Sequence, residues 1–76
     1  MAEQTLQRGS EGDDVKSVQE ALIELDFKPG EADGVFGTFT DSAVKQFQRW
    51  AQIAVDGIVG PTTKERLDDA PRPGAA

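Results

Sequence analysis

A short motif that occurs twice is the strongest constraint on how this chain folds. Asp33-Gly34-Val35-Phe36-Gly37-Thr38-Phe39-Thr40 returns twenty-three residues later as Asp56-Gly57-Ile58-Val59-Gly60-Pro61-Thr62-Thr63. Both copies read Asp-Gly, two apolar residues, Gly, two further residues and Thr. A repeat at a fixed spacing indicates one structural unit that is used twice.

Each copy has the composition of a tight turn that leads into a helix. The Gly after each Asp accepts a positive φ, and the Asp side chain can bond the backbone of its own turn. The second Gly is an acceptable N-cap. In the second copy Pro61 follows at the preferred first position of a helix. We therefore expect two matched Asp-Gly-x-x-Gly turn-to-helix units, with Phe36 in the core.

Apolar periodicity predicts three helices, over residues 13–25, 38–51 and about 61–68. The first two have clear core faces, made by Val15, Val18, Leu22 and Leu25 in one and by Thr40, Ala43, Val44, Phe47 and Ala51 in the other. The third helix is short and depends on Leu67 as its anchor. No sustained period-two pattern indicates a sheet, so the expected fold is all-α, a compact three-helix bundle.

The chain has 76 residues, which is enough for one small domain. We expect that domain to cover residues 6–68 and to be a monomer. Residues 1–5 are polar, and residues 69–76 are dominated by Pro, Gly and Ala. Both ends are expected to be disordered because neither can contribute to a core.

The amino-acid composition argues against several classes of function. The chain contains no Cys and no His, which argues against a Cys-based metal site, a cofactor or an enzyme. Its formal net charge is -6, so nucleic acid and anionic membranes are not expected partners. No stretch is long and apolar enough to predict a membrane span.

The two turn aspartates allow three interpretations. Asp33 and Asp56 could form a carboxylate pair for acid–base work, bond the N–H groups of their own turns, or bind calcium. The second loop lacks the alternating oxygen ligands of a calcium site, and turn bonding is the commonest role of such an Asp. Thr40 and Thr63 could be nucleophiles, but no base accompanies them, and capping or packing is the expected role.

Two aromatic residues on the second helix form a stripe beside its core face. Phe39 and Trp50 lie on this stripe with Gln46, and Arg49 is adjacent. The stripe could pack under the first helix or the 27–32 loop, or it could line a shallow groove. An indole can hold the apolar face of a sugar or a peptide methyl, and amide and guanidinium groups can satisfy amides and carboxylates.

The ordered series of motifs resembles the type 1 family of peptidoglycan-binding domains. The resemblance spans roughly residues 6–67, and the matching segments are Leu6 to Val15 with Val18, Gln19 and Leu22; Asp33 to Thr40 with Ala43 to Gln48; and Asp56 to Thr63 with Leu67. It differs at the ends of the first two helices, where the family commonly has Gly and this chain has Asp26 and Gln52.

The resemblance implies a non-catalytic module that attaches reversibly to bacterial cell-wall peptidoglycan. It also implies a fused or partner hydrolase and a cell-wall or secreted location. The expected groove lies between the second and third helices, near the turns. The expected ligand contacts are Asp33, Phe39, Gln46, Arg49, Trp50 and Asp56.

An alternative is an intracellular protein–protein adaptor that reuses the same fold. The N-terminus has no basic region and no apolar run, so it does not resemble a signal peptide. A cytoplasmic location is therefore open on the sequence.

Overall fold

The structure, a computed structural model, describes residues 5–70. It contains three helices: α1 (Asp13–Glu24), α2 (Thr38–Trp50) and α3 (Pro61–Asp69). Within residues 5–70 no strand forms, and the only β pairings are two isolated bridges. The expected all-α, three-helix fold is confirmed. The segments 1–4 and 71–76, which include most of the two ends expected to be disordered, lie outside the described residues.

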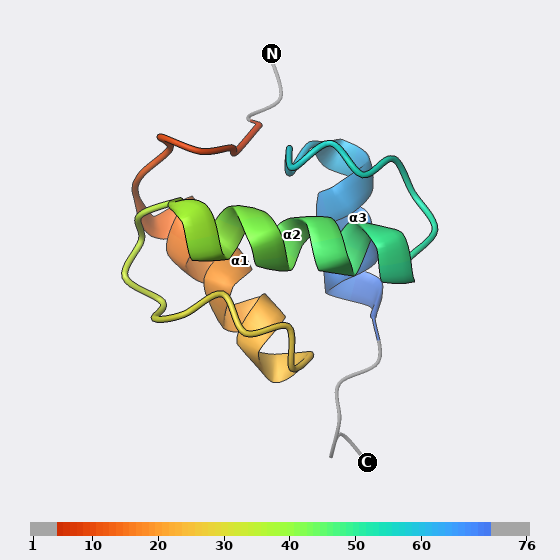
Figure 1. Cartoon of the computed structure of the whole chain (residues 1–76), viewed down its shortest axis with the longest axis horizontal. Helices are drawn as coiled ribbons and strands as arrows, with labels where there is room; N and C mark the ends of the chain where they lie inside the picture. Colours follow the sequence, from red (N-terminus) through yellow and green to blue (C-terminus); the bar gives the residue numbers. More distant parts are fainter. Residues whose placement is uncertain (1–4, 71–76) are drawn as a thin grey trace.

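The helix α2 crosses the molecule in front of α1 and α3 (Figure 1). Packing of the three helices buries one core, whose members come from every helix and from both turns. The buried apolar residues are Leu6, Val15, Val18, Leu22, Phe36, Ala43, Val44, Phe47, Val59 and Leu67. The core faces predicted for the first two helices and the Leu67 anchor predicted for the third therefore pack here, with Leu25 and Ala51 only partly buried.

Each helix begins directly after a glycine. Gly37 and Gly60 precede α2 and α3 with extended backbones, and no side chain caps either N-terminus. Pro61 occupies the first turn of α3, where its missing N–H leaves no bond unmade. Two acids, Asp13 and Asp14, lie in the first turn of α1, where they favour the positive end of the helix dipole.

The first two helices end in the same left-handed motif, although neither end has a glycine. Asp26 and Gln52 have φ of 68° and 60°. At each end, the N–H of the left-handed residue and the N–H of the next residue bond carbonyls of the last helical turn. The bonds are Asp26 N to Ile23 O at 3.0 Å, Phe27 N to Leu22 O at 2.8 Å, Gln52 N to Arg49 O at 3.2 Å and Ile53 N to Gln48 O at 3.1 Å. This Schellman pattern normally places Gly at the left-handed position, so both side chains carry conformational strain.

The segment before α1 connects the two turns. Leu6 and Val59 exchange backbone hydrogen bonds of 3.1 and 2.7 Å, which ties the start of the described chain to the second turn. A few residues later, Gly9 donates to the Phe36 carbonyl at 3.1 Å, and Phe36 donates to Ser10 at 2.9 Å in the first turn. The segment before α1, which turns at residues 8–9, therefore pairs with equivalent positions of both motif copies.

Candidate functional site

The two Asp-Gly turns share one geometry. Asp33 Oδ1 accepts the Val35 N–H at 3.0 Å, and Asp56 Oδ1 accepts the Ile58 N–H at 3.0 Å. The glycine after each Asp has a positive φ, 79° in the first turn and 73° in the second. Of the three interpretations for these acids, bonding within their own turns is therefore the one present in the structure.

A buried glutamine holds the first turn. The side chain of Gln19, from α1, is almost completely buried. Its Oε1 accepts the Gly34 N–H at 2.8 Å, while its Nε2 lies 3.2 Å from Asp33 Oδ1, 2.9 Å from the Val35 carbonyl and 2.9 Å from Thr40 Oγ1. The amide therefore joins a helix, a turn and the start of the next helix.

Gln48 of α2 repeats this arrangement at the second turn. Its Oε1 accepts the N–H groups of Asp56 and Gly57 at 3.1 and 3.0 Å. Its Nε2 lies 2.9 Å from Asp56 Oδ1, 3.0 Å from the Ile58 carbonyl and 3.1 Å from Thr63 Oγ1. Each glutamine with its turn forms a unit that we call a glutamine clamp.

The glutamine clamps explain the threonines and the aspartates. Thr40 and Thr63 are buried and receive hydrogen bonds from the clamp amides, which is a packing role and not that of an activated nucleophile. The pKa of Asp33 lies below its usual range, chiefly because of the Val35 N–H and then the Gln19 amide. The pKa of Asp56 is lowered by the Ile58 N–H and then by Gln48. Both carboxylates are therefore held ionised, as hydrogen-bond acceptors.

The two clamp glutamines were not among the residues with a predicted role. A weak signal was present, because Gln19 and Gln48 each lie four residues after a buried valine, Val15 and Val44, and hence on the core side of a helix. The distance from glutamine to turn aspartate differs, fourteen residues in the first unit and eight in the second. The fixed period of the turns therefore does not extend to the helices that hold them.

Two small hollows lie over the turns at equivalent positions. The first has a volume of about 140 Å³ and contains Asp33 and Phe39, and the second has a volume of about 240 Å³ and contains Asp56. All eight residues that line the second hollow correspond, at the twenty-three-residue spacing, to residues that line the first: Ile53, Ala54, Asp56, Ile58, Gly60, Pro61, Thr62 and Thr63. The duplication thus extends to the surface, with an aromatic side chain in only the first copy.

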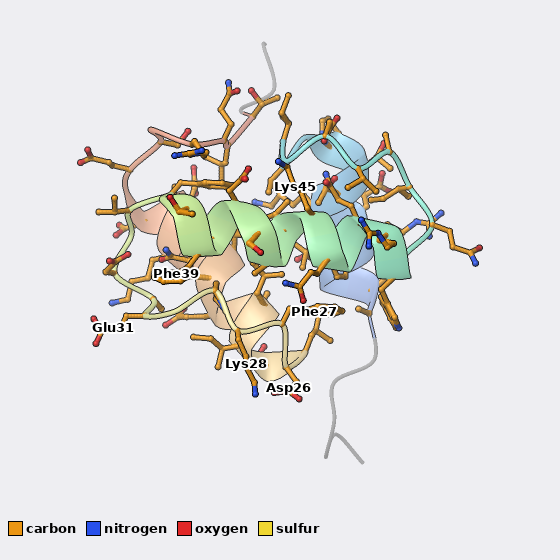
Figure 2. All side chains as sticks on the ribbon, viewed as in Figure 1. Asp26, Phe27, Lys28, Glu31, Phe39 and Lys45 are labelled. Atoms are coloured by element: carbon orange, nitrogen blue, oxygen red, sulfur yellow. The ribbon has the colours of Figure 1, made fainter. Side chains whose placement is uncertain are left out.

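The aromatic stripe does not converge on one place. Phe39 lies in the first helical turn of α2 and is 73% exposed. It faces the loop that precedes the Asp33-Gly34 turn, and a Cβ at Gly30 would lie 3.6 Å from the Cβ of Phe39. In Figure 2, Phe39 lies at the start of α2 and Phe27 lies further along, below the middle of the helix. Trp50, at the last position of α2, is 55% exposed.

Trp50 packs on the core and also reaches the surface. Its ring centroid lies 6.0 Å from that of Phe27 and 5.8 Å from that of Phe47, and these two rings meet edge to face at 5.7 Å. Phe27 therefore folds back from the end of α1 onto the core, and Phe47 lies in the core, where the sequence pattern placed it. The remaining part of the indole faces a hollow.

This hollow, which we call the Trp50 hollow, lies between the C-terminal ends of α2 and α3. It has a volume of about 340 Å³ and is lined by Trp50, Ala51, Gln52, Arg66, Asp69 and Ala70. Arg66 Nη1 donates to the Ala51 carbonyl at 3.2 Å, which links the two helix ends. The volume is within the range of small-molecule sites.

The other expected contacts lie elsewhere. Gln46 is exposed on α2 and donates to Ser42 Oγ at 3.3 Å, and Arg49 is also exposed on that helix. The structure thus brings Asp33 and Phe39 together and places Asp56 and Trp50 in separate hollows. Arg66, Gln52 and Asp69, which join Trp50, were not among the expected contacts.

Metal-binding clusters and membrane-spanning helices are both absent from the part of the chain that the structure describes. Residues 5–70 contain no group of three or more His, Cys, Asp or Glu side chains that could hold a metal ion. None of the three helices is both long enough and apolar enough to cross a membrane.

Comparisons with known proteins agree on one family. A family model described as "Putative peptidoglycan binding domain" matches residues 11–67. The spore cortex-lytic enzyme of Oceanobacillus iheyensis is 41% identical over 69 residues, which cover 91% of this chain and 25% of that enzyme. The type VI secretion system spike protein VgrG3 of Vibrio cholerae is 45% identical over 76 residues, covering 83% of this chain and 8% of VgrG3. The chain thus spans a quarter or less of both relatives.

Solved structures give the same result. The crystal structure of the SleB N-terminal domain superposes with a TM-score of 0.87 at 40% identity, and the match covers 92% of this chain and 96% of that domain. A peptidoglycan-binding protein from Clostridioides difficile superposes with a TM-score of 0.81 at 34% identity, covering 84% of this chain and 40% of that protein. The chain therefore belongs to the peptidoglycan binding domain family.

Proposed function

We propose that this chain is a non-catalytic module that binds bacterial cell-wall peptidoglycan reversibly and so localises a fused or partner protein. The observation that carries the proposal is the match to a solved domain over nearly the whole length of both chains. Several relatives are hydrolases of which the matching domain is a small part, such as the spore cortex-lytic enzymes. A cell-wall association follows for the module in the same way.

The features of the surface fit binding better than catalysis. The turn aspartates are acceptors for their own turns, and the threonines of the clamps are buried. Exposed aromatic and amide groups remain, chiefly Trp50 and Phe39. Such groups can contact sugars and peptides without performing chemistry on them. The adaptor alternative is not favoured, since the relatives include cell-wall hydrolases.

Among the six expected contacts, Trp50 has the surroundings of a binding residue, because it lines a hollow together with charged and amide side chains. Phe39, Gln46 and Arg49 are exposed along α2 and would supply secondary contacts. We assign Asp33 and Asp56 to the maintenance of the turns. The module is proposed to act as a monomer.

A sedimentation assay tests the proposal. The purified domain is incubated with insoluble peptidoglycan and centrifuged, with cellulose particles as a control polymer that lacks both acetamido groups and peptides. We expect the domain to sediment with peptidoglycan and to stay in solution with cellulose. A folded domain that remains in the supernatant at every peptidoglycan concentration would contradict the proposal.

Paired leucine substitutions test the surface. Trp50→Leu keeps an apolar side chain against Phe27 and Phe47 but removes the indole, and it is expected to lower the sedimented fraction at least fivefold. Phe39→Leu, at the other end of α2, serves as the matched control and is expected to have a smaller effect. Equal losses in both variants, with unchanged melting temperatures, would refute the assignment to Trp50.

A further inference from the structure

We propose that the Trp50 hollow binds the acetamido group of N-acetylated amino sugars in the glycan strand. The inference rests on the proposed function and names the part of the polymer that is recognised. Two helices end at this hollow, and they place an aromatic ring, a guanidinium and a carboxylate around one open space of about 340 Å³. An acetamido group has a methyl, a carbonyl and an N–H, so it offers one partner to each.

The indole provides the apolar contact. Phe27 and Phe47 pack against Trp50 at centroid distances of 6.0 and 5.8 Å and hold the ring in place, while 55% of the residue stays exposed. A fixed, half-exposed aromatic surface is suited to a methyl group or to the apolar face of a sugar ring, since it gains contact area with little loss of side-chain freedom.

Arg66 is positioned as a donor. Its Nη1 bonds the Ala51 carbonyl at 3.2 Å, which anchors the guanidinium at the mouth of the hollow. A guanidinium has five N–H donors, so this bond leaves others for the oxygen of a ligand. The exposed end of Gln52 lies in the same lining and offers both a donor and an acceptor.

The charges around the hollow favour a neutral ligand. Arg66 and Asp69 both line it, so their formal charges cancel. The C-terminal ends of α2 and α3 add negative partial charge. A carboxylate would meet Asp69 and both helix ends, and an ammonium would meet Arg66. An uncharged amide avoids both penalties, because its carbonyl can accept from Arg66 and its N–H can donate to Asp69.

Three other hollows are less suited to this ligand. A larger space of about 570 Å³ beside α1 and Asp68 is lined by Glu20, Glu24 and Asp68 and by no aromatic side chain. The two hollows over the turns are smaller, about 140 and 240 Å³, and neither contains a Lys or Arg side chain.

Trp50 itself reports on the proposed ligand. It is the only Trp of the chain, which has no Tyr, so tryptophan fluorescence comes from this hollow alone. The domain is titrated with the tetramer of N-acetylglucosamine and, in parallel, with the de-N-acetylated glucosamine tetramer. We expect a saturable change with the acetylated tetramer and at least tenfold weaker binding of the de-N-acetylated one.

The comparison of the two tetramers is stringent, because the net charge of the protein favours the sugar that is expected to bind more weakly. The glucosamine tetramer is a polycation, and the protein has a net charge of -6, so non-specific attraction favours the de-N-acetylated sugar. Equal binding of the two sugars, or tighter binding of the glucosamine tetramer, would overturn the inference. A fluorescence change with a D-alanyl-D-alanine peptide but not with the acetylated sugar would also overturn it and would indicate the stem peptide.

A pair of arginine variants tests the donor. Arg66→Gln is expected to weaken binding of the acetylated tetramer about three- to tenfold, which is the usual effect of losing one hydrogen bond. Arg8→Gln, on the exposed segment before α1 and outside the hollow, is the matched control and should bind as the unmodified domain does. Equal affinities in the two folded variants would remove Arg66 from the site.

Sedimentation with insoluble peptidoglycan separates the two proposals. If the domain sediments with peptidoglycan but its fluorescence does not respond to the acetylated tetramer, only the assignment of this hollow fails. If it does not sediment, the proposed function fails as well. The titration with unmodified protein needs no variant, so a substitution that unfolds the domain does not prevent the test.

Discussion

The clamp around the second turn predicts a large cost for one buried amide. In Gln48→Leu the side chain keeps a similar volume but loses both polar ends. The Gly57 N–H, on a buried residue, then loses its acceptor, and the Thr63 hydroxyl loses its donor. The Asp56 N–H belongs to an exposed residue and can donate a hydrogen bond to water instead.

The loss of unfolding free energy in Gln48→Leu can be estimated from the hydrogen bonds of the Gln48 amide. The amide has two N–H and two acceptor positions, so its five contacts amount to about four good hydrogen bonds. At about 1 kcal/mol each, their loss costs about 4 kcal/mol. The more apolar Leu returns about 1 kcal/mol. The expected loss of unfolding free energy is about 3 kcal/mol, against a total of roughly 3–10 kcal/mol for a domain of this size.

Urea unfolding monitored by Trp50 fluorescence measures this loss. With a slope of about 1 kcal/mol per molar urea, the midpoint should fall by about 3 M. Gln46→Leu is the matched control, two residues away on the same helix but exposed, and should change stability by less than about 0.5 kcal/mol. If Gln48→Leu unfolds within about 1 kcal/mol of the unmodified domain at the same slope, the clamp does not stabilise the turn as argued.

Two further predictions concern the helix ends and the turn acids. Asp26→Gly and Gln52→Gly should each stabilise the domain by about 0.5–1 kcal/mol, because glycine adopts the left-handed conformation without strain. The melting temperature of each variant should rise by a few degrees. A fall in either melting temperature would show that the native side chain compensates the strain. The pKa values of Asp33 and Asp56 are lowered from 3.8, so their stabilising contribution is present above pH about 4 and is lost as the pH falls below that through the folded-state pKa values. Asp33→Asn combined with Asp56→Asn should flatten the dependence of stability on pH below about 4, and an unchanged acid profile would contradict this.

The sequence was sufficient to predict the elements whose signals are local. Gly34 and Gly57 require a positive φ, Pro61 favours a helix start, and the apolar spacing of α1 and α2 defines their core faces. Each of these preferences belongs to a residue and its near neighbours in the chain, so no partner from elsewhere in the fold is needed to recognise it.

The clamps and the Trp50 hollow could not be predicted in the same way. Gln19 is polar, so its position on the core side of α1 does not reveal a role unless its partners on a distant turn are known. Arg66 meets the Ala51 carbonyl fifteen residues away, on a helix too short to give a clear periodicity. Phe39 and Trp50 do lie on one stripe of α2, and the 27–32 loop packs against both, with Gly30 beside Phe39 and Phe27 against Trp50. The stripe alone could not show that the two side chains line separate hollows.

The pairing of Leu6 with Val59 bears on where this module can be cut. The family model begins at residue 11, but the backbone bonds of Leu6, Gly9 and Ser10 hold both turns from outside that boundary, and Leu6 is part of the core. A shortened chain that begins at residue 11 would leave an open backbone edge on Val59 and a gap beside it. The smallest autonomous unit is therefore longer than the stretch by which the family is recognised, and a fusion partner joined at the N-terminal side needs its linker before residue 6.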